Sequence, residues 1–205
     1  MKLHWSPRSP FVRKVMIFAH ETGQADSLGR MRNVVAMRKP NATVMRDNPL
    51  GKLPTLVLDD GRALFDSAVI CEYLDSLHAG APLFPKSGEA RWQALRWHAL
   101  GDGLLDALVL WRNERERDAP QQLQDLMAAF ELKTRATLAR LDAETPALDK
   151  SAFGIGHIAI VCALGYLGFR FPEFDWRAGN ARLAGWYDRQ AQRPSVRMTV
   201  PADDE

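Results

Sequence analysis

The sequence has 205 residues, of which 46% are hydrophobic and 25% are charged, and its formal net charge is +2. This length is enough for one large domain or two small ones, and the composition is typical of a globular protein. A net charge this small is not that of a nucleic-acid-binding surface, which is densely basic. The most apolar run, Ile158 to Leu167, is too short to span a bilayer and indicates a buried helix.

The first part of the chain alternates strand and helix patterns. Gly23 is placed to end the first helix, and a β-hairpin is predicted around Asp59-Asp60-Gly61. The predicted elements, in order, are a strand at Lys2–Trp5, a helix from Pro10 to about Thr22, a strand at Asn33–Met37, a helix within 38–49, strands at Thr55–Leu58 and Arg62–Phe65, and a helix at Ser67–Leu77.

The stretch AGAPLFPKSG at 79–88 is rich in proline and glycine, which predicts a linker. Strand patterns stop after it, and only helical spacing of apolar residues follows. The predicted helices are Glu89–Arg117, Gln121–Glu144, Ile155–Leu167 and Ala181–Gln190. We therefore expect an α/β domain at residues 1–80 and an all-α domain at residues 88–205.

The two cysteines, Cys71 and Cys162, form neither a disulfide framework nor a metal-binding pair in the sequence. We expect buried, reduced thiols in a cytoplasmic protein that uses no metal. The opening residues MKLHWSPRSPF also lack the apolar stretch of a secretory signal peptide.

Ser9 and Pro10 stand at the start of the first predicted helix. Taken alone, the pair is best interpreted as a helix cap followed by a first-turn proline. The same position offers unpaired backbone N–H groups and a partial positive charge, which suit a bound anion. A hydroxyl there can also donate a hydrogen bond to a thiolate.

The segment NPLGKLPT at 48–55 is a turn that leads into a strand, with Pro54 at the strand's entry. Proline donates no hydrogen bond to a sheet, so it suits an edge or a first strand position. A cis peptide bond here turns the backbone of Leu53 outward, where its N–H and C=O can pair with an extended peptide.

Phe65-Asp66-Ser67 precedes the next predicted helix, with Ser67 expected as its N-cap and Asp66 near its positive end. The structural interpretation is a plain cap. The functional one is a site where Ser67 and the helix end hold a carboxylate while Asp66 holds an ammonium group. Those two groups sit together on the α-carbon of an amino acid.

In this order the three motifs describe a site for a short thiol peptide, and the combination resembles the glutathione transferase superfamily. The resemblance rests on SPFVRKV, NPLGKLPTL, LFDSAVICEYLD and CALGYLGFRFPEFDW and spans essentially the whole chain. It is closest to bacterial cytosolic members with a serine at the start of the first helix. It implies a thioredoxin-like N-terminal domain, an all-helical C-terminal domain, a homodimer, and no nucleic-acid or membrane partner.

Carried over residue by residue, the resemblance implies that Ser9 is the catalytic, thiol-activating residue. Ser6 is its rival, and counting back from Arg13 in the family pattern favours Ser9. The implied glutathione-binding residues are Lys52 for the glycine carboxylate, Leu53 and the cis-proline Pro54 for the cysteinyl part, and Asp66 and Ser67 for the γ-glutamyl end.

The resemblance also implies a pocket for the second substrate, with the candidates Trp5, Arg8, Leu108, Trp111 and Arg112. Two of these, Leu108 and Trp111, equally fit the core stripe of a helix.

Two acids on the same predicted helix, Asp102 and Asp106, stand one turn apart. The resemblance suggests that such an acid reaches glutathione across a dimer, and a solvated or capping role fits equally.

The buried helix departs from the family pattern, because Gly154-Ile155-Gly156-His157 replaces a Ser/Thr-x-x-Asp box. We expect the reciprocal side-chain bonds of that box to be lost, at a cost of about 1 kcal/mol. No partner for His157 is visible in the sequence, so we expect a structural role for it.

The resemblance implies a detoxification enzyme whose glutathione thiolate attacks a small hydrophobic electrophile. The four residues from Ser9 to Val12 lack the CxxC pair of thioredoxin-like relatives, which excludes dithiol exchange at this site. Two alternatives stay open. One is another glutathione-dependent enzyme, such as an isomerase, a peroxidase or a dehalogenase. The other is a non-catalytic protein that uses the fold for binding.

Overall fold

The computed structural model describes residues 1–203, which divide into two compact units. Unit 1 combines Met1–Arg91 with the segment from Pro194 onward, and unit 2 is Trp92–Arg193. The expected domains, 1–80 and 88–205, placed that last segment with the helices. It groups with unit 1, where it packs against the first helix and the side chain of Arg13 donates to the carbonyl of Val196.

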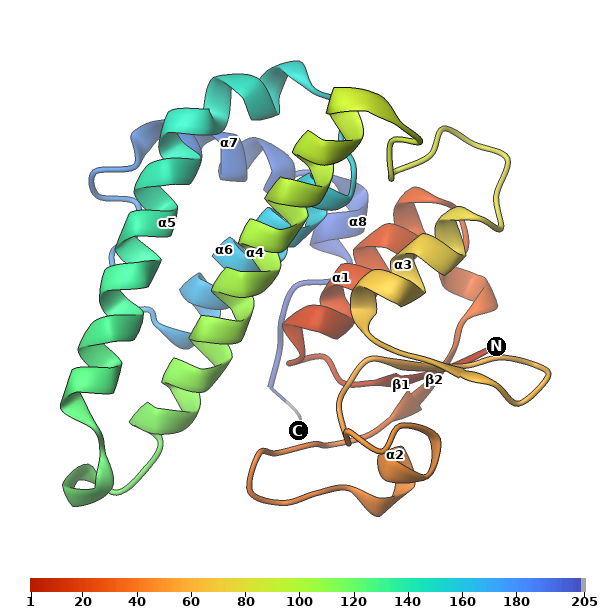
Figure 1. The fold of residues 1–205 in the computed structure, drawn as a ribbon, viewed down its shortest axis with the longest axis horizontal. Helices are drawn as coiled ribbons and strands as arrows, with labels where there is room; N and C mark the ends of the chain where they lie inside the picture. Colours follow the sequence, from red (N-terminus) through yellow and green to blue (C-terminus); the bar gives the residue numbers. More distant parts are fainter. Residues whose placement is uncertain (204–205) are drawn as a thin grey trace. The chain divides into compact units, whose positions relative to one another are not determined.

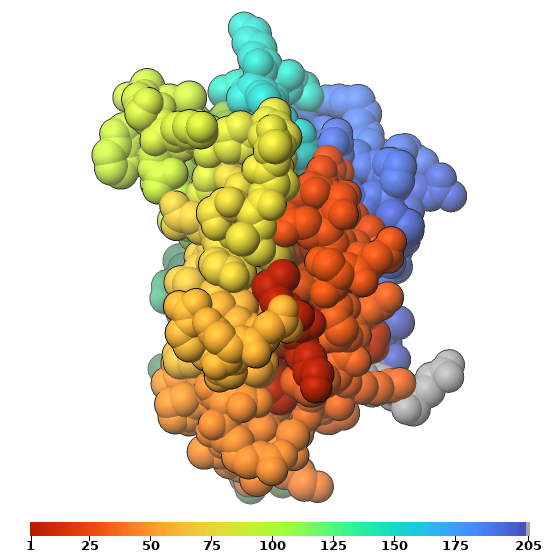
Figure 2. Space-filling model, turned by 90° about the vertical axis from the view of Figure 1, so that its right-hand side faces the viewer, coloured from red at the N-terminus to blue at the C-terminus, as the bar shows by residue number. Residues whose placement is uncertain are grey.

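Unit 1 is built on a four-stranded sheet with the order β2-β1-β3-β4. Strand β1 pairs in parallel with β2 and antiparallel with β3, and β3 pairs antiparallel with β4. Figure 2 shows the start of β1, in dark red, between the β3–β4 hairpin and the region of β2. The strands are β1 (Lys2–Trp5), β2 (Gly29–Arg32), β3 (Thr55–Val57) and β4 (Ala63–Leu64).

Helices cover both faces of this sheet, with α1 and α3 on one side and α2 on the other (Figure 1). The inner face of α1 is apolar at helical spacing, as predicted, and Val12, Val15 and Ala19 are buried there. The elements are α1 (Pro10–Glu21), a 3₁₀ turn (Ala25–Ser27), α2 (Ala42–Asp47), α3 (Ser67–Asp75) and α8 (Pro194–Arg197).

The second strand was misplaced by the sequence analysis, which put it at Asn33–Met37. It lies at Gly29–Arg32, where the sequence GRMR is polar and largely exposed. An edge strand needs only one paired backbone edge, so it carries little of the apolar alternation that sequence patterns detect.

Unit 2 is helical, with α6 at its core, where the helix is buried from Ile155 to Leu164. Helix α4 packs closely on α6, because a Cβ at Gly101 would lie 2.7 Å from the backbone of Ala159. A Cβ at Gly156 would likewise lie 2.8 Å from the side chain of Trp97. The elements are α4 (Gly88–Arg115), a 3₁₀ turn (Ala119–Gln121), α5 (Gln124–Lys150), α6 (Ile155–Arg170) and α7 (Ala181–Ala191).

An α/β region followed by a helical region confirms the predicted fold class, and every predicted helix is present. Among the described residues, the single turn α8 and the two 3₁₀ turns were not predicted. Within residues 1–203 no helix combines the length and the hydropathy needed to cross a bilayer.

Candidate functional site

The strand register brings the three sequence motifs to one end of the sheet of unit 1. His4 in β1 lies opposite Thr55 in β3, and Leu56 in β3 lies opposite Leu64 in β4. Strand β3 is antiparallel to both β1 and β4. The chain therefore leaves β1, enters β3 and leaves β4 at the same end of the sheet. The Ser9 loop, the Leu53–Pro54 segment and the Asp66–Ser67 helix start therefore share that end.

Ser9 is the N-cap of α1, and its Oγ accepts the N–H of Val12 at 3.3 Å. A hydroxyl has two acceptor lone pairs and one proton, so capping leaves the proton available for donation. Ser9 is half-buried, whereas its rival Ser6 is only 2% exposed. The structural and the functional interpretations of Ser9 are thus compatible, and access favours Ser9 over Ser6.

The Leu53–Pro54 peptide bond is cis, which confirms the expectation for Pro54. Within residues 1–203, neither the N–H nor the C=O of Leu53 forms a hydrogen bond, and both are available to an extended peptide. The Lys52 side chain is exposed, and the described residues offer it no ion-pair partner.

Asp66, and not Ser67, is the N-cap of α3, so the predicted cap is one residue out. The Asp66 carboxylate accepts the N–H of Ala68 at 2.7 Å, and Ser67 is the first helical residue. Aspartate and serine are equally good caps, so sequence alone does not choose between them. Asp66 is exposed, while Ser67 is 2% exposed and its hydroxyl has no hydrogen-bond partner within the described chain.

The residues expected for the second substrate are divided between the two units. Trp5 and Arg8 lie in unit 1, where Arg30 stacks over the Trp5 ring at 5.9 Å. The other three, Leu108, Trp111 and Arg112, lie on α4 in unit 2.

Each residue on α4 has neighbours within its own unit. Leu108 is fully buried in the core, and Arg112 forms an ion pair with Glu116 at 2.6 Å. Trp111 packs against Phe171, with ring centroids 4.7 Å apart.

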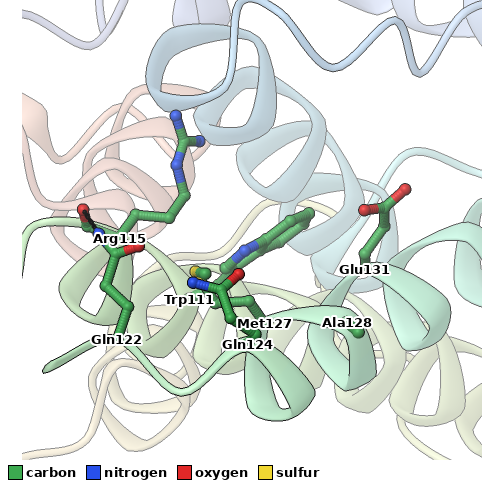
Figure 3. Close-up of a pocket in the computed structure, with 7 residues that line it drawn as sticks. All are labelled: Trp111, Arg115, Gln122, Gln124, Met127, Ala128 and Glu131. Atoms are coloured by element: carbon green, nitrogen blue, oxygen red, sulfur yellow. Dashed lines mark hydrogen bonds between the residues drawn. The ribbon is translucent and has the colours of Figure 1, made fainter. Parts of the chain in front are cut away.

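A pocket of about 440 Å³ lies in unit 2 beside Trp111, between the end of α4 and the start of α5 (Figure 3). Its charged groups are already neutralised, because Arg115 pairs with Glu173 and Glu131 pairs with Arg135. Sequence analysis singled out only Trp111, since a polar helix connection carries no motif. The lining residues are Trp111, Arg115, Gln122, Gln124, Met127, Ala128 and Glu131.

His157 partly restores the capping box that the sequence analysis considered lost. Its Nδ1 accepts the N–H of Gly154 at 3.3 Å, and its Nε2 lies 3.1 Å from the carbonyl of Leu148. Burial lowers the pKa of His157 below its usual value, which favours the neutral ring with its proton on Nε2. The backbones of Gly154 and Leu148 are therefore the partners of His157 that the sequence did not reveal.

Other polar side chains of unit 2 also bond within that unit. Glu144 accepts the indole N–H of Trp97 at 2.6 Å and is held by Arg96 and Arg140. Burial alone raises the pKa of Glu144, but these hydrogen bonds lower it to about 2. Asp102 lies 3.0 Å from His98 on the same helix, which gives it a local partner.

The sequence analysis missed the contacts of four buried or partly buried polar residues at the turn before Leu53. His4 bonds Asp47 at 2.7 Å, and the side-chain amide of Asn48 donates to the Thr55 hydroxyl at 3.0 Å. Asn48 belongs to the NPLG turn, and the turn's local signal hid its tertiary contact. Within residues 1–203, no cluster of three or more His, Cys, Asp or Glu side chains is placed to hold a metal ion.

Comparison with known families matches residues 8–77 to the glutathione S-transferase N-terminal domain and residues 121–189 to its C-terminal domain. An uncharacterized GST-like protein of Escherichia coli K12, YibF, is 32% identical over 203 residues, which are 98% of each chain.

Two solved structures of a glutathione transferase family member from Pseudomonas fluorescens Pf-5 are also similar. One contains glutathione and is 44% identical, with a TM-score of 0.96 over 98% of this chain and 99% of the other. The second contains S-(propanoic acid)-glutathione and is 42% identical, with a TM-score of 0.91 over the same shares.

Proposed function

This chain belongs to the glutathione S-transferase superfamily, and from that premise we propose that it binds glutathione as co-substrate in unit 1 and activates its thiol for attack on a small hydrophobic electrophile. The observation that carries the proposal is the convergence of Ser9, Leu53 and Asp66 at one sheet end, each with a group available to a ligand. The glutathione-bound relative supports the choice of thiol peptide.

In this proposal the Ser9 hydroxyl donates a hydrogen bond to the glutathione thiolate at the start of α1. A free thiol has a pKa near 8.5, and lowering it by two units takes about 2.7 kcal/mol. A hydrogen bond to a charged group supplies about 1.5–3 kcal/mol, and the helix end adds about 0.3–1 kcal/mol. The hydroxyl and the helix are together sufficient, and binding both reactants adds a proximity effect.

The remaining groups match the rest of the peptide. The backbone of Leu53, next to the cis Pro54, pairs with the cysteinyl part in the manner of an added strand. The exposed ammonium of Lys52 holds the glycine carboxylate. Asp66 holds the γ-glutamyl ammonium, while Ser67 and the helix end hold its carboxylate.

Of the residues predicted for the second substrate, Trp5, Arg8, Trp111 and Arg112 are proposed to contact it, whereas Leu108 has no exposed surface and is left as a core residue. The relative with S-(propanoic acid)-glutathione supports a site that accepts a substituent on the glutathione sulfur. An alanine substitution at Trp111 should raise the Michaelis constant for the electrophile and leave that for glutathione unchanged.

We also propose a cytoplasmic homodimer. Exposed apolar side chains on unit 1, including Met45, Leu50 and Val69, favour an interface with a second copy. Two buried cysteines outside any disulfide favour a reducing compartment. Sedimentation velocity at micromolar concentration should show a dimer, and a stable monomer would rule the dimer out.

Calorimetric titration with glutathione, followed by assay of chlorodinitrobenzene conjugation, tests the proposed function. We expect saturable binding and conjugation that depends on both substrates. Failure to bind millimolar glutathione refutes the whole proposal. Binding without turnover on any electrophile favours the non-catalytic alternative, and turnover only on peroxides or on isomerisable substrates favours the other glutathione-dependent enzymes.

A further inference from the structure

We propose that Asn48 and Thr55 are positioning residues that aim the backbone of Leu53 at glutathione, an inference that rests on the proposed function. The two side chains and the carbonyl of Lys52 form a closed hydrogen-bonded cluster, here called the clamp. Neither side chain has access to the ligand, because Asn48 is 1% exposed and Thr55 is fully buried. Any effect on binding therefore passes through the backbone that they hold.

Both side chains of the clamp bond the same carbonyl. The Thr55 hydroxyl donates to the Lys52 oxygen at 2.9 Å, and the Asn48 amide donates to it at 3.3 Å. The amide also donates to the Thr55 hydroxyl at 3.0 Å, while the Asn48 oxygen accepts the N–H of Leu50 at 3.0 Å. The two lone pairs of the Lys52 oxygen are thus both engaged.

Fixing this carbonyl fixes the next N–H. The peptide unit between Lys52 and Leu53 is planar, so in its trans form the C=O and the N–H point in opposite directions. The clamp holds the Lys52 oxygen toward the interior of unit 1. The N–H of Leu53 is consequently directed away from the clamp, and within the described residues it has no partner.

A second pair of contacts anchors the clamp to the sheet. Thr55 lies directly opposite His4 on the neighbouring strand, and His4 bonds Asp47, the residue before Asn48. Asn33 donates from its side chain to the other ring nitrogen of His4 at 3.0 Å. His4 thus bonds Asp47 and Thr55 bonds Asn48, so this cross-strand pair holds the end of α2. The sheet thereby positions the turn from Asn48 to Lys52.

Plain packing does not require this arrangement. Apolar side chains of the same shape in place of two hydrogen-bonded partners often leave the stability of a core unchanged or raise it. Two contacts of the clamp hold one peptide unit by the Lys52 carbonyl, and the third joins the two side chains. That unit carries two of the groups assigned to glutathione at this position, the Lys52 side chain and the Leu53 N–H.

The test compares Thr55→Val, which removes the hydroxyl and keeps the shape, with Thr55→Ser, which keeps the hydroxyl. Calorimetry with glutathione should show Kd raised by roughly tenfold in the valine variant and restored to within about twofold in the serine variant. Thr145→Val is the matched control, because that buried hydroxyl donates to the Leu141 carbonyl in unit 2, and its Kd should not change. Asn48→Ala, which removes the amide donor without adding a charge, is used if Thr55→Val does not fold.

A thioamide analogue of glutathione, in which sulfur replaces the oxygen of the cysteinyl carbonyl, separates positioning from general destabilisation. In the wild type the analogue should bind roughly tenfold more weakly than glutathione, because sulfur is a poorer acceptor for the N–H of Leu53. In Thr55→Val the same change should cost less than about threefold, since the Leu53 backbone is no longer aligned. Equal costs in both proteins, or an unchanged glutathione Kd in Thr55→Val, overturn the inference. Failure of the wild type to bind glutathione overturns the proposed function as well.

Discussion

Helix starts in the two units differ in which groups bond the free backbone N–H groups at the start of the helix. In unit 1, Ser9 and Asp66 cap α1 and α3 from half-buried or exposed positions at one end of the sheet. In unit 2, the buried Gly154 is the N-cap of α6, and His157 of that helix accepts the backbone N–H of this glycine. The first two starts retain groups for a ligand, whereas the third is completed by the protein itself.

This difference shows how a cap becomes a site. All three helix starts have the same orphan N–H groups and the same positive end of a dipole. The two helix starts in unit 1 differ from the third because a ligand can reach them and because their capping side chains can form further hydrogen bonds. We therefore expect substitutions at the helix starts of unit 1 to change the binding or activation of glutathione. Substitutions of the buried polar residues Glu144 and His157 in unit 2 should change only the stability of the fold.

The largest effect is expected for Ser9→Ala. Loss of one hydrogen bond to the thiolate should raise the pKa of bound glutathione by about one to two units and slow conjugation at neutral pH by roughly 10- to 100-fold. The rate should recover partly at high pH. Thiolate absorbance of the complex against pH measures the shift, with Ser6→Ala as the control. An unshifted titration in Ser9→Ala removes Ser9 from the mechanism.

A smaller effect is expected at the start of α3. Asp66→Asn keeps an equally good cap but loses the charge, so the Michaelis constant for glutathione should rise by about tenfold with little change in stability. Ser67→Ala should act in the same direction. Both residues hold a part of the substrate that does not react, so turnover at saturation should be unchanged. A fall in turnover with a constant Michaelis constant would place them elsewhere in the mechanism.

In unit 2, Glu144→Gln should destabilise the fold by roughly 1–3 kcal/mol without changing glutathione affinity. The folded-state pKa of Glu144, about 2, lies below its usual 4.5. Its stabilising contribution is therefore present above pH 4.5 and is lost as the pH falls toward 2. Chemical denaturation of both proteins across this range should show a weaker pH dependence in the variant. An equal pH dependence would contradict the assignment.

The smallest effect is expected for His157→Gln, since glutamine can accept from Gly154 and donate to Leu148 without titrating. Burial lowers the pKa of His157 below 6.5, so the unfolded chain binds its proton first. Stability supplied by the neutral ring is present above pH 6.5 and falls as the pH drops below it. Melting temperatures between pH 7.5 and 5.5 should therefore decrease less in the variant, and identical slopes would refute the role of His157.

The sequence predicted the elements whose signals are local. Pro10 begins α1 as expected, and the hairpin lies around Asp60-Gly61 because those residues favour a turn. The edge strand at Gly29–Arg32 was misplaced because backbone pairing, and not side-chain alternation, defines it.

Tertiary partners lay outside what the sequence could show. The Asn48–Thr55 contact, the bond from His157 to Gly154 and the packing of the Pro194 segment on unit 1 join residues with no shared periodicity. The order of the motifs predicted where a peptide binds. The groups that orient that site became visible only with the fold.

We propose above all that one end of the unit 1 sheet holds glutathione with its sulfur at Ser9. A crystal structure of the protein with glutathione tests it most directly. We expect the sulfur within hydrogen-bond distance of the Ser9 hydroxyl, the cysteinyl backbone paired with Leu53, and the γ-glutamyl group against Asp66 and Ser67. Glutathione bound elsewhere, or bound here with its sulfur directed away from Ser9, would contradict the account.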